Sequence, residues 1–169
     1  MLFSCDFFGK VKPQSFRGSN WCLLFICDKC GFAKAKPLQR KAQAPAALEE
    51  FVQEIRKTCG VKPGEMKTEK RKLVFAGVHS DNEPVFRGKE WKDVCERMDI
   101  AELHSVPYEP QMNGTVERFV QTVKSALRTT MAHVDAKLWD YAVDHIVKVW
   151  NMRISPKASC CGDGSLKCP

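Results

Sequence analysis

The amino-acid sequence predicts an α/β fold with a five-stranded mixed sheet flanked by helices. Three short apolar runs within residues 2–38 have the length of strands and are separated by turn-forming residues. Beyond them, apolar residues recur at helical spacing, and two further strand-like runs alternate with helical segments. Strands and helices in this order are typical of a sheet with helices packed on its faces.

The first three elements are expected to be strands joined by tight connections. Residues 2–8 are mostly apolar with one acid, and the continuous apolar run 21–27 is too short for a helix and fits a central strand. Residues 9–20 hold the glycine, proline, serine and asparagine of a hairpin connection. A third strand is expected over 32–38, with Pro37 near its end.

After residue 38 the spacing of apolar residues changes from that of a strand to that of a helix. A helix is expected from Pro45, which suits the first helical position, to the residue before Gly60. Residues 61–72 are charged and are expected to form a solvated connection. A strand, a short helix, a strand and two longer helices then complete the domain, over residues 73–78, 91–98, 101–106, 114–132 and 138–151.

Composition limits the class of protein. With roughly 150 residues per domain, a chain of 169 residues is expected to hold one domain over residues 1–156, followed by an aperiodic, disordered tail over 157–169. No apolar run is long enough to span a membrane, so no membrane association is expected. The formal net charge of +7 favours a polyanion such as nucleic acid as partner, although basic proteins without that role are common.

The nine cysteines are expected to be reduced thiols, because their number is odd and the N-terminus lacks a secretory signal. Cys27 and Cys30 have the spacing of half a zinc site, but no second pair follows at a ligand-like distance. The cysteines in strand-like runs are therefore expected to act as small core residues.

Three acids stand where the expected elements would bring them together. Asp6 is near the end of the first strand, Asp81 is just past the fourth, and Glu117 is in the first turn of a helix. If the first and fourth strands are neighbours, the aspartates converge and a packed helix adds the glutamate. Such a group needs cations to offset its repulsion, and its hard oxygens suit two Mg²⁺ or Mn²⁺ ions. The alternative is that each acid is a surface residue or a cap.

Four short sequence motifs are more specific than the spacing of the three acids. They are Cys-Asp-Phe-Phe-Gly at 5–9, Phe-Ile-Cys-Asp at 25–28, His-Ser-Asp-Asn at 79–82 and, most specific, Pro-Tyr-Glu-Pro-Gln-Met-Asn-Gly-Thr-Val-Glu-Arg at 107–118. In addition, 35 residues separate Asp81 from Glu117. Over roughly residues 2–156 the chain thus resembles the catalytic core of retroviral-type integrases, in particular those of copia-type LTR retrotransposons, as a fragment of a larger Pol polyprotein or a relic of one.

The resemblance implies an RNase H-like fold and a catalytic triad of Asp6, Asp81 and Glu117 that holds the divalent metals. It implies DNA integration: 3′-end processing of retrotransposon DNA, then strand transfer into target DNA, both of which are phosphoryl displacements. The implied partners are element ends, target DNA and further copies of the chain, with no small-molecule substrate, in the nucleus. A catalytically silent, nucleic-acid-binding remnant is the alternative; an unrelated RNase H-like nuclease is disfavoured by the motif at 107–118.

Residues for DNA contact follow from the helix that carries the glutamate. Polar side chains share its outward face at helical spacing, namely Glu117, Gln121, Lys124 and Arg128. This order indicates a metal ligand followed by phosphate contacts, and a solvated surface is the alternative. The resemblance adds a flexible loop with Gln111 and Asn113 at the DNA, and Asp28 as a group that supports the site without holding metal.

The turn after Asp81 departs from the family. After the Asp-Asn pair the family usually has glycine and then a Glu-Phe pair, whereas this chain has Glu83, Pro84, Val85 and Phe86. Loss of the glycine is expected to stiffen the turn beside a metal ligand. His79 and His104 are expected to be ordinary residues at strand ends, and the alternative is that they line the site.

Overall fold

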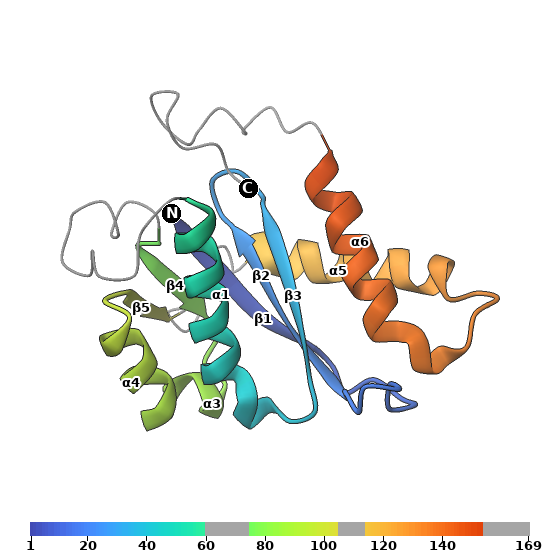
Figure 1. Cartoon of the computed structure of the whole chain (residues 1–169), viewed down its shortest axis with the longest axis horizontal. Coiled ribbons are helices and arrows are strands. Elements are labelled where there is room, and N and C mark those ends of the chain that lie inside the picture. Colours follow the sequence, from blue (N-terminus) through green and yellow to red (C-terminus); the bar gives the residue numbers. More distant parts are fainter. Residues whose placement is uncertain (60–74, 105–113, 154–169) are drawn as a thin grey trace.

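Five strands form a mixed sheet with helices on both faces in a computed structural model, which describes residues 1–59, 75–104 and 114–153 (Figure 1). The strands are β1 (Leu2–Gly9), β2 (Trp21–Cys27), β3 (Ala33–Leu38), β4 (Gly77–Ser80) and β5 (Ala101–His104). Their order across the sheet is β3-β2-β1-β4-β5. β2 is antiparallel to both of its neighbours, while β1, β4 and β5 run parallel to one another. The predicted fold class is confirmed.

The helices cover the two faces of the sheet as separate groups. They are α1 (Ala44–Thr58), α3 (Pro84–Arg87), α4 (Lys89–Arg97), α5 (Gly114–Thr130) and α6 (Trp139–Met152), with short 3-10 turns η1 (Lys41–Gln43) and η3 (Ala136–Leu138). One core cluster joins the sheet to α1, α3 and α4, and the other joins it to α5 and α6. β1 therefore lies at the centre of the sheet, between two hydrophobic cores.

Side-chain alternation along β1 decides which core each residue enters. Phe3, Cys5 and Phe7 are buried in the cluster that includes α1, whereas Phe8 is buried in the cluster that includes α5. Asp6 lies between Cys5 and Phe7 in the chain, so it belongs to the face that α5 covers. It is half-buried there.

Two elements differ from the sequence-based expectation. The fourth strand was expected over 73–78, but β4 is Gly77–Ser80 and includes the buried polar side chains of His79 and Ser80. Polar residues at 79 and 80 predicted that the strand ends before them. The strand nevertheless continues through them, because β4 lies between β1 and β5 in the sheet. The turn at Pro84 forms the unexpected helix α3, which buries Phe86 in stacking contact with Phe7, 5.0 Å between ring centroids.

A glycine permits the close approach of β4 and β5. A Cβ atom at Gly77 would lie 2.6 Å from the backbone oxygen of Ala101, which is too close for any side chain. Gly77 is the partner of Ala101 in the parallel ladder and also of Leu2 on the other side. The glycine therefore allows β4 to pair closely with β5.

An asparagine fastens α6 to the edge of the sheet. Its side chain accepts a hydrogen bond from the backbone N–H of Ala33 at 2.8 Å and donates one to the carbonyl of the same residue at 2.7 Å. This asparagine, Asn151, thereby satisfies one backbone donor and one acceptor of β3. Trp150 adds a hydrogen bond from its indole Nε1 to the carbonyl of Gly31 at 2.8 Å.

The prediction that cysteines in strand-like runs are small core residues is confirmed for the part of the chain that the structure describes. There Cys5, Cys22 and Cys27 of the strands are buried core residues, and Cys30 and Cys95 are buried as well. In the same ranges no helix is both long and apolar enough to cross a membrane. The expected charged connection at 61–72 and the expected tail at 157–169 lie outside the described residues.

Candidate functional site

The register of two parallel strands brings the two aspartates together. Ser4 of β1 pairs with His79 of β4. Two residues farther along each segment, Asp6 stands level with Asp81, the residue that directly follows β4. Since side chains alternate along both segments, the two carboxylates are directed to the same face of the sheet. The expected juxtaposition of first and fourth strands is thus confirmed.

Asp6 lies in an unfavourable electrostatic environment for its charged form. Burial is the largest cause that raises its pKa, to about 6 from an ordinary value of 3.8, and the nearby carboxylates of Asp81, Glu83 and Glu117 raise it further. A hydrogen bond from the backbone N–H of Phe7 to Oδ1, 2.6 Å long, works in the opposite direction. Asp6 is therefore a partly desolvated carboxylate surrounded by others of the same charge.

Asp81 is held in a turn and has a raised pKa for a similar reason. Burial is the first cause, and the Glu83 carboxylate adds to it, while Lys41 and His104 favour the charged form. The backbone N–H of Glu83 donates to Oδ1 of Asp81 at 3.1 Å and lowers the pKa. The backbone N–H of Glu83 thus orients the carboxylate of Asp81.

Glu117 stands in the first turn of α5 with an exposed side chain. Its charge acts on Asp6, so the three acids share one electrostatic environment. Within residues 1–59, 75–104 and 114–153, however, no three histidine, cysteine, aspartate or glutamate side chains are gathered closely enough to form a ready metal site. The donors fit a divalent cation in chemical type and in charge, since Mg²⁺ and Mn²⁺ prefer carboxylate oxygens.

A lysine that the sequence analysis missed acts on Asp81 by its charge and pairs with Glu83. Lys41 Nζ donates to both carboxylate oxygens of Glu83, each at 2.6 Å. The ammonium also lies over the rings of Trp21 and Phe7, 4.4 and 4.8 Å from their centroids. Neither spacing nor periodicity relates Lys41 to Glu83, because only the folded arrangement of η1 and α3 brings them together.

His104 at the end of β5 also acts on Asp81. Its Nε2 lies 2.8 Å from a carboxylate oxygen of Glu102, and its Nδ1 lies 3.3 Å from the hydroxyl of Ser80. The charge of His104 favours the ionised form of Asp81. This histidine is therefore part of the surroundings of the site and not only a residue at a strand end.

The outward face of α5 continues from Glu117 toward a basic hollow. Gln121, Lys124 and Arg128 are exposed, as expected, while the opposite face buries Val116, Phe119, Val120 and Val123. A hollow of about 290 Å³ lies between the end of β1 and α5. It is lined by Phe8, Gly9, Lys10, Val11, Lys124, Leu127 and Arg128. Lys10 was missed by the sequence analysis because the hairpin after β1 showed only turn signals.

Other expected site residues have different surroundings. Asp28 accepts a hydrogen bond from the hydroxyl of Ser4 at 2.7 Å, so it is joined to β1 two residues before Asp6. Its supporting role stays a prediction. Gln111 and Asn113 lie outside the described residues.

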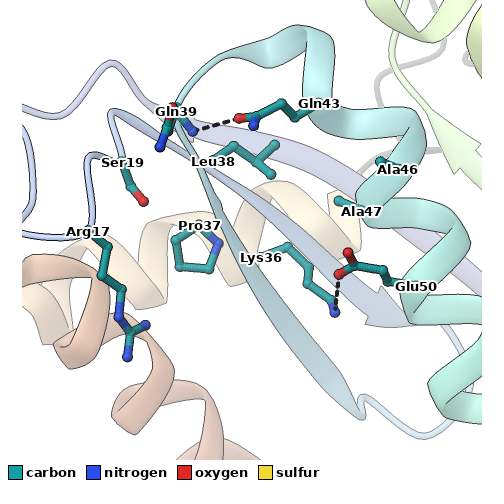
Figure 2. A pocket seen from close by; sticks show the side chains of 10 residues that line it. All are labelled: Arg17, Ser19, Lys36, Pro37, Leu38, Gln39, Gln43, Ala46, Ala47 and Glu50. Carbon is teal, nitrogen blue, oxygen red and sulfur yellow. Dashed lines mark hydrogen bonds and ion pairs between the residues drawn. The ribbon is translucent and has the colours of Figure 1, made fainter.

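A second hollow, of about 370 Å³, lies between β3 and the start of α1 and contains none of the three acids (Figure 2). Some of its polar groups pair with one another, and Lys36 also pairs with Glu54, 2.7 Å away. Lys36 forms an ion pair with Glu50 at 3.2 Å, and Gln43 accepts a hydrogen bond from the backbone N–H of Gln39 at 2.8 Å. Figure 2 shows both pairs along the wall of the hollow. This hollow is therefore a less suitable site for chemistry than the Asp6–Asp81 group.

Curated relatives are polyproteins of retroviruses and transposons. The chain is 42% identical over 50 residues to the Gag-Pro-Pol polyprotein of squirrel monkey retrovirus, a match of 30% of this chain and 3% of that protein. It is 36% identical over 67 residues to the Tf2-3 transposon polyprotein of Schizosaccharomyces pombe, which is 40% of this chain and 5% of that protein. The chain therefore spans a small part of these relatives. No family model matches.

Solved structures show the same fold. The catalytic core domain of BIV integrase has a TM-score of 0.64 and 18% identity, covering 90% of this chain and 84% of that one. A chain of the simian T-cell lymphotropic virus intasome, solved in complex with a PP2A regulatory subunit, also has a TM-score of 0.64, with 16% identity, covering 86% of this chain and 46% of that one. The narrower resemblance to copia-type elements stays a prediction. The chain is thus related in sequence to retroviral and Tf2 transposon polyproteins, and it has the RNase H-like fold of retroviral integrase catalytic cores.

Proposed function

We propose that this chain is the catalytic core of an integrase, a metal-dependent polynucleotidyl transferase that processes the 3′ ends of retrotransposon DNA and joins them to target DNA. The observation that carries the proposal is the register of the parallel strands β1 and β4, which places Asp6 of β1 level with Asp81, the residue directly after β4. The raised pKa values of both aspartates support it, because perturbed carboxyl groups of like charge are typical of sites that bind cations or perform chemistry.

The proposed metal ligands are Asp6, Asp81 and Glu117. A bound Mg²⁺ or Mn²⁺ pair would supply Lewis-acid stabilisation of the attacking and leaving oxygens of a phosphodiester. The chain's own groups prepare the carboxylates: the backbone N–H of Phe7 orients Asp6, and that of Glu83 orients Asp81. The exposed position of Glu117 on α5 leaves it free to approach the aspartates.

The basic hollow beside α5 is the proposed DNA contact. Lys10, Lys124 and Arg128 line it, and it adjoins the helix face that begins with Glu117. Phosphate contacts of this kind position DNA without reading its sequence. The proposal also includes Gln121, Gln111 and Asn113 as DNA contacts, assembly of several copies on DNA, and action in the nucleus, where target DNA lies.

A second candidate is a catalytically silent remnant that binds nucleic acid. The observation that favours it is that, in the described part of the chain, the three acids are not gathered into a ligand group. Both candidates share the basic surface on α5, so DNA binding does not separate them. Chemistry does.

A disintegration assay tests the proposal. A branched DNA substrate that requires only core chemistry is incubated with the chain and Mn²⁺ or Mg²⁺. We expect metal-dependent resealing that Asp81→Asn abolishes and that Asp93→Asn, an exposed acid on α4, leaves unchanged. DNA binding without any resealed product would favour the silent remnant.

A further inference from the structure

An ion pair beside Asp81 takes no part in the chemistry proposed above. Lys41 begins η1 and Glu83 directly precedes α3, 42 residues later in the chain. The lysine Nζ is 2.6 Å from each oxygen of the Glu83 carboxylate. Both side chains are about two-thirds buried, with 30% and 28% of their surface exposed. The pair is thus less screened than an ion pair on an open surface.

Lys41 is fixed from two sides. On one side it meets Glu83, and on the other it lies over the rings of Phe7 and Trp21. Rings attract a cation through the negative charge on their faces. Phe7 directly follows Asp6 in β1, so this ring ties the position of the ammonium to the strand that carries the first aspartate.

The pair is linked directly to Asp81. The backbone N–H of Glu83 donates to Asp81 Oδ1 at 3.1 Å, so Lys41, Glu83 and Asp81 form a continuous chain of contacts. The Glu83 carboxylate repels both aspartates, while the Lys41 ammonium attracts Asp81. The two members of the pair therefore act on the aspartates with opposite sign.

Charge counting shows what each member contributes. Asp6, Asp81, Glu117 and Glu83 carry four negative charges when ionised, and Lys41 reduces the total to three. Without the lysine, an entering divalent cation meets four negative charges; without the Glu83 charge it meets two. If both charges are removed, the total is again three, as in the unaltered chain.

We propose that Lys41 offsets the charge of Glu83 beside the Asp6–Asp81 carboxylate group, so that the pair adds no net charge there, while each member alone shifts the affinity for a divalent cation in the opposite direction. The inference rests on the proposed function, because the divalent cation is the cofactor of that function. It assigns Lys41 and Glu83 as positioning residues that act through Asp81.

The test measures the dissociation constant of Mn²⁺ by isothermal titration calorimetry on the 169-residue chain. Lys41→Met should bind Mn²⁺ about fivefold more tightly and Glu83→Gln about fivefold more weakly, a size that one partly screened charge permits. The double variant should return to within about twofold of the unaltered chain, because its charge total is the same. Lys41→Arg should also resemble the unaltered chain.

Two controls separate this effect from a general change of charge or fold. Lys36→Met removes the same charge from the ion pair of Lys36 with Glu50 on the wall of the other hollow (Figure 2), and should not alter Mn²⁺ affinity. Thermal unfolding in EDTA and in Mn²⁺ gives a readout independent of the titration. The midpoint temperature of unfolding of Lys41→Met should be lower than that of the unaltered chain in EDTA and should recover in Mn²⁺.

Each outcome decides between the two proposals. Opposite shifts for Lys41→Met and Glu83→Gln, cancelling in the double variant, support the inference. Mn²⁺ binding that Asp81→Asn abolishes but that neither variant changes more than Lys36→Met overturns the inference and leaves the proposed function standing. Absence of Mn²⁺ binding to the unaltered chain overturns the metal site of the proposed function, and the inference with it.

Discussion

Ser4 pairs with His79 across the parallel strands β1 and β4, and this register is what places Asp6 level with Asp81. A shift by one residue would direct one of the two carboxylates to the opposite face of the sheet. The register is secured on both sides of β4, since Gly77 pairs with Leu2 of β1 and with Ala101 of β5. The site therefore depends on strand pairing as much as on the acids themselves.

Gly77→Ala should displace β4 from its position between β1 and β5 or destabilise the whole chain. The new Cβ would lie 2.6 Å from the carbonyl oxygen of Ala101, a backbone atom that cannot move away alone. We expect a loss of more than about 2 kcal/mol in the free energy of unfolding, measured in urea. Gly88→Ala is the matched control, because its Cβ would lie 3.3 Å from the nearest atom at an ordinary backbone angle. Equal effects of the two would contradict the close-approach argument.

Asp6 should make the stability of the cation-free chain depend on pH. Its pKa of about 6 in the folded chain exceeds the ordinary 3.8, so the folded state favours the neutral form. Its contribution is full below pH 3.8 and is lost as the pH rises through about 6. In EDTA we expect a loss of about 1–2 kcal/mol over this interval, reduced for partial solvent screening.

Asp6→Asn is the comparison that isolates this effect. The difference in unfolding free energy between the unaltered chain and Asp6→Asn, measured at pH 4 and pH 7, should change in favour of the variant at the higher pH. The raised pKa of Asp81 acts in the same direction and remains in both proteins. A difference that does not vary with pH would show that Asp6 is not perturbed.

Asn151→Ala should loosen α6 from β3. The substitution removes both hydrogen bonds to the Ala33 backbone and leaves its N–H and carbonyl without these partners. We expect a loss of about 1–3 kcal/mol in urea unfolding, the usual range for partly buried polar groups left unsatisfied. Met152→Ala is the neighbouring control, since that side chain is 82% exposed and should cost little.

Lys124→Ala and Arg128→Ala should each weaken DNA binding to a similar extent for any DNA sequence. Both side chains line the basic hollow beside α5, where phosphate is the proposed ligand. Each substitution should lower the slope of log affinity against log salt by about 1, as measured by fluorescence anisotropy. Lys57→Ala, an exposed lysine on α1, tests whether the loss is local. An unchanged salt slope in the α5 variants would contradict the assignment.

The strands that are purely apolar were predictable from the sequence to within a residue. β2 matches its apolar run because every side chain from Cys22 to Cys27 is buried. β4 was misplaced because His79 and Ser80 are polar yet buried, and only their position between β1 and β5 explains that burial. Local pattern carries information on periodicity, but it carries none on which strands become neighbours.

The site was predictable only in part for the same reason. The spacing of Asp81 and Glu117 and the position of Asp6 are visible in the chain, whereas the pairing of Lys41 with Glu83 joins two segments 42 residues apart. Lys10 falls in a turn whose residues predicted a connection and nothing more. Charges that act on a site from other segments become evident only once the fold is known.

Anomalous scattering from crystals of the chain grown with Mn²⁺ tests the central claim most directly. The account predicts a manganese peak in contact with carboxylate oxygens of both Asp6 and Asp81, and its loss in crystals of Asp81→Asn. Manganese bound elsewhere while the Asp6–Asp81 group stays empty at saturating Mn²⁺ would contradict the claim that these aspartates hold the catalytic metal.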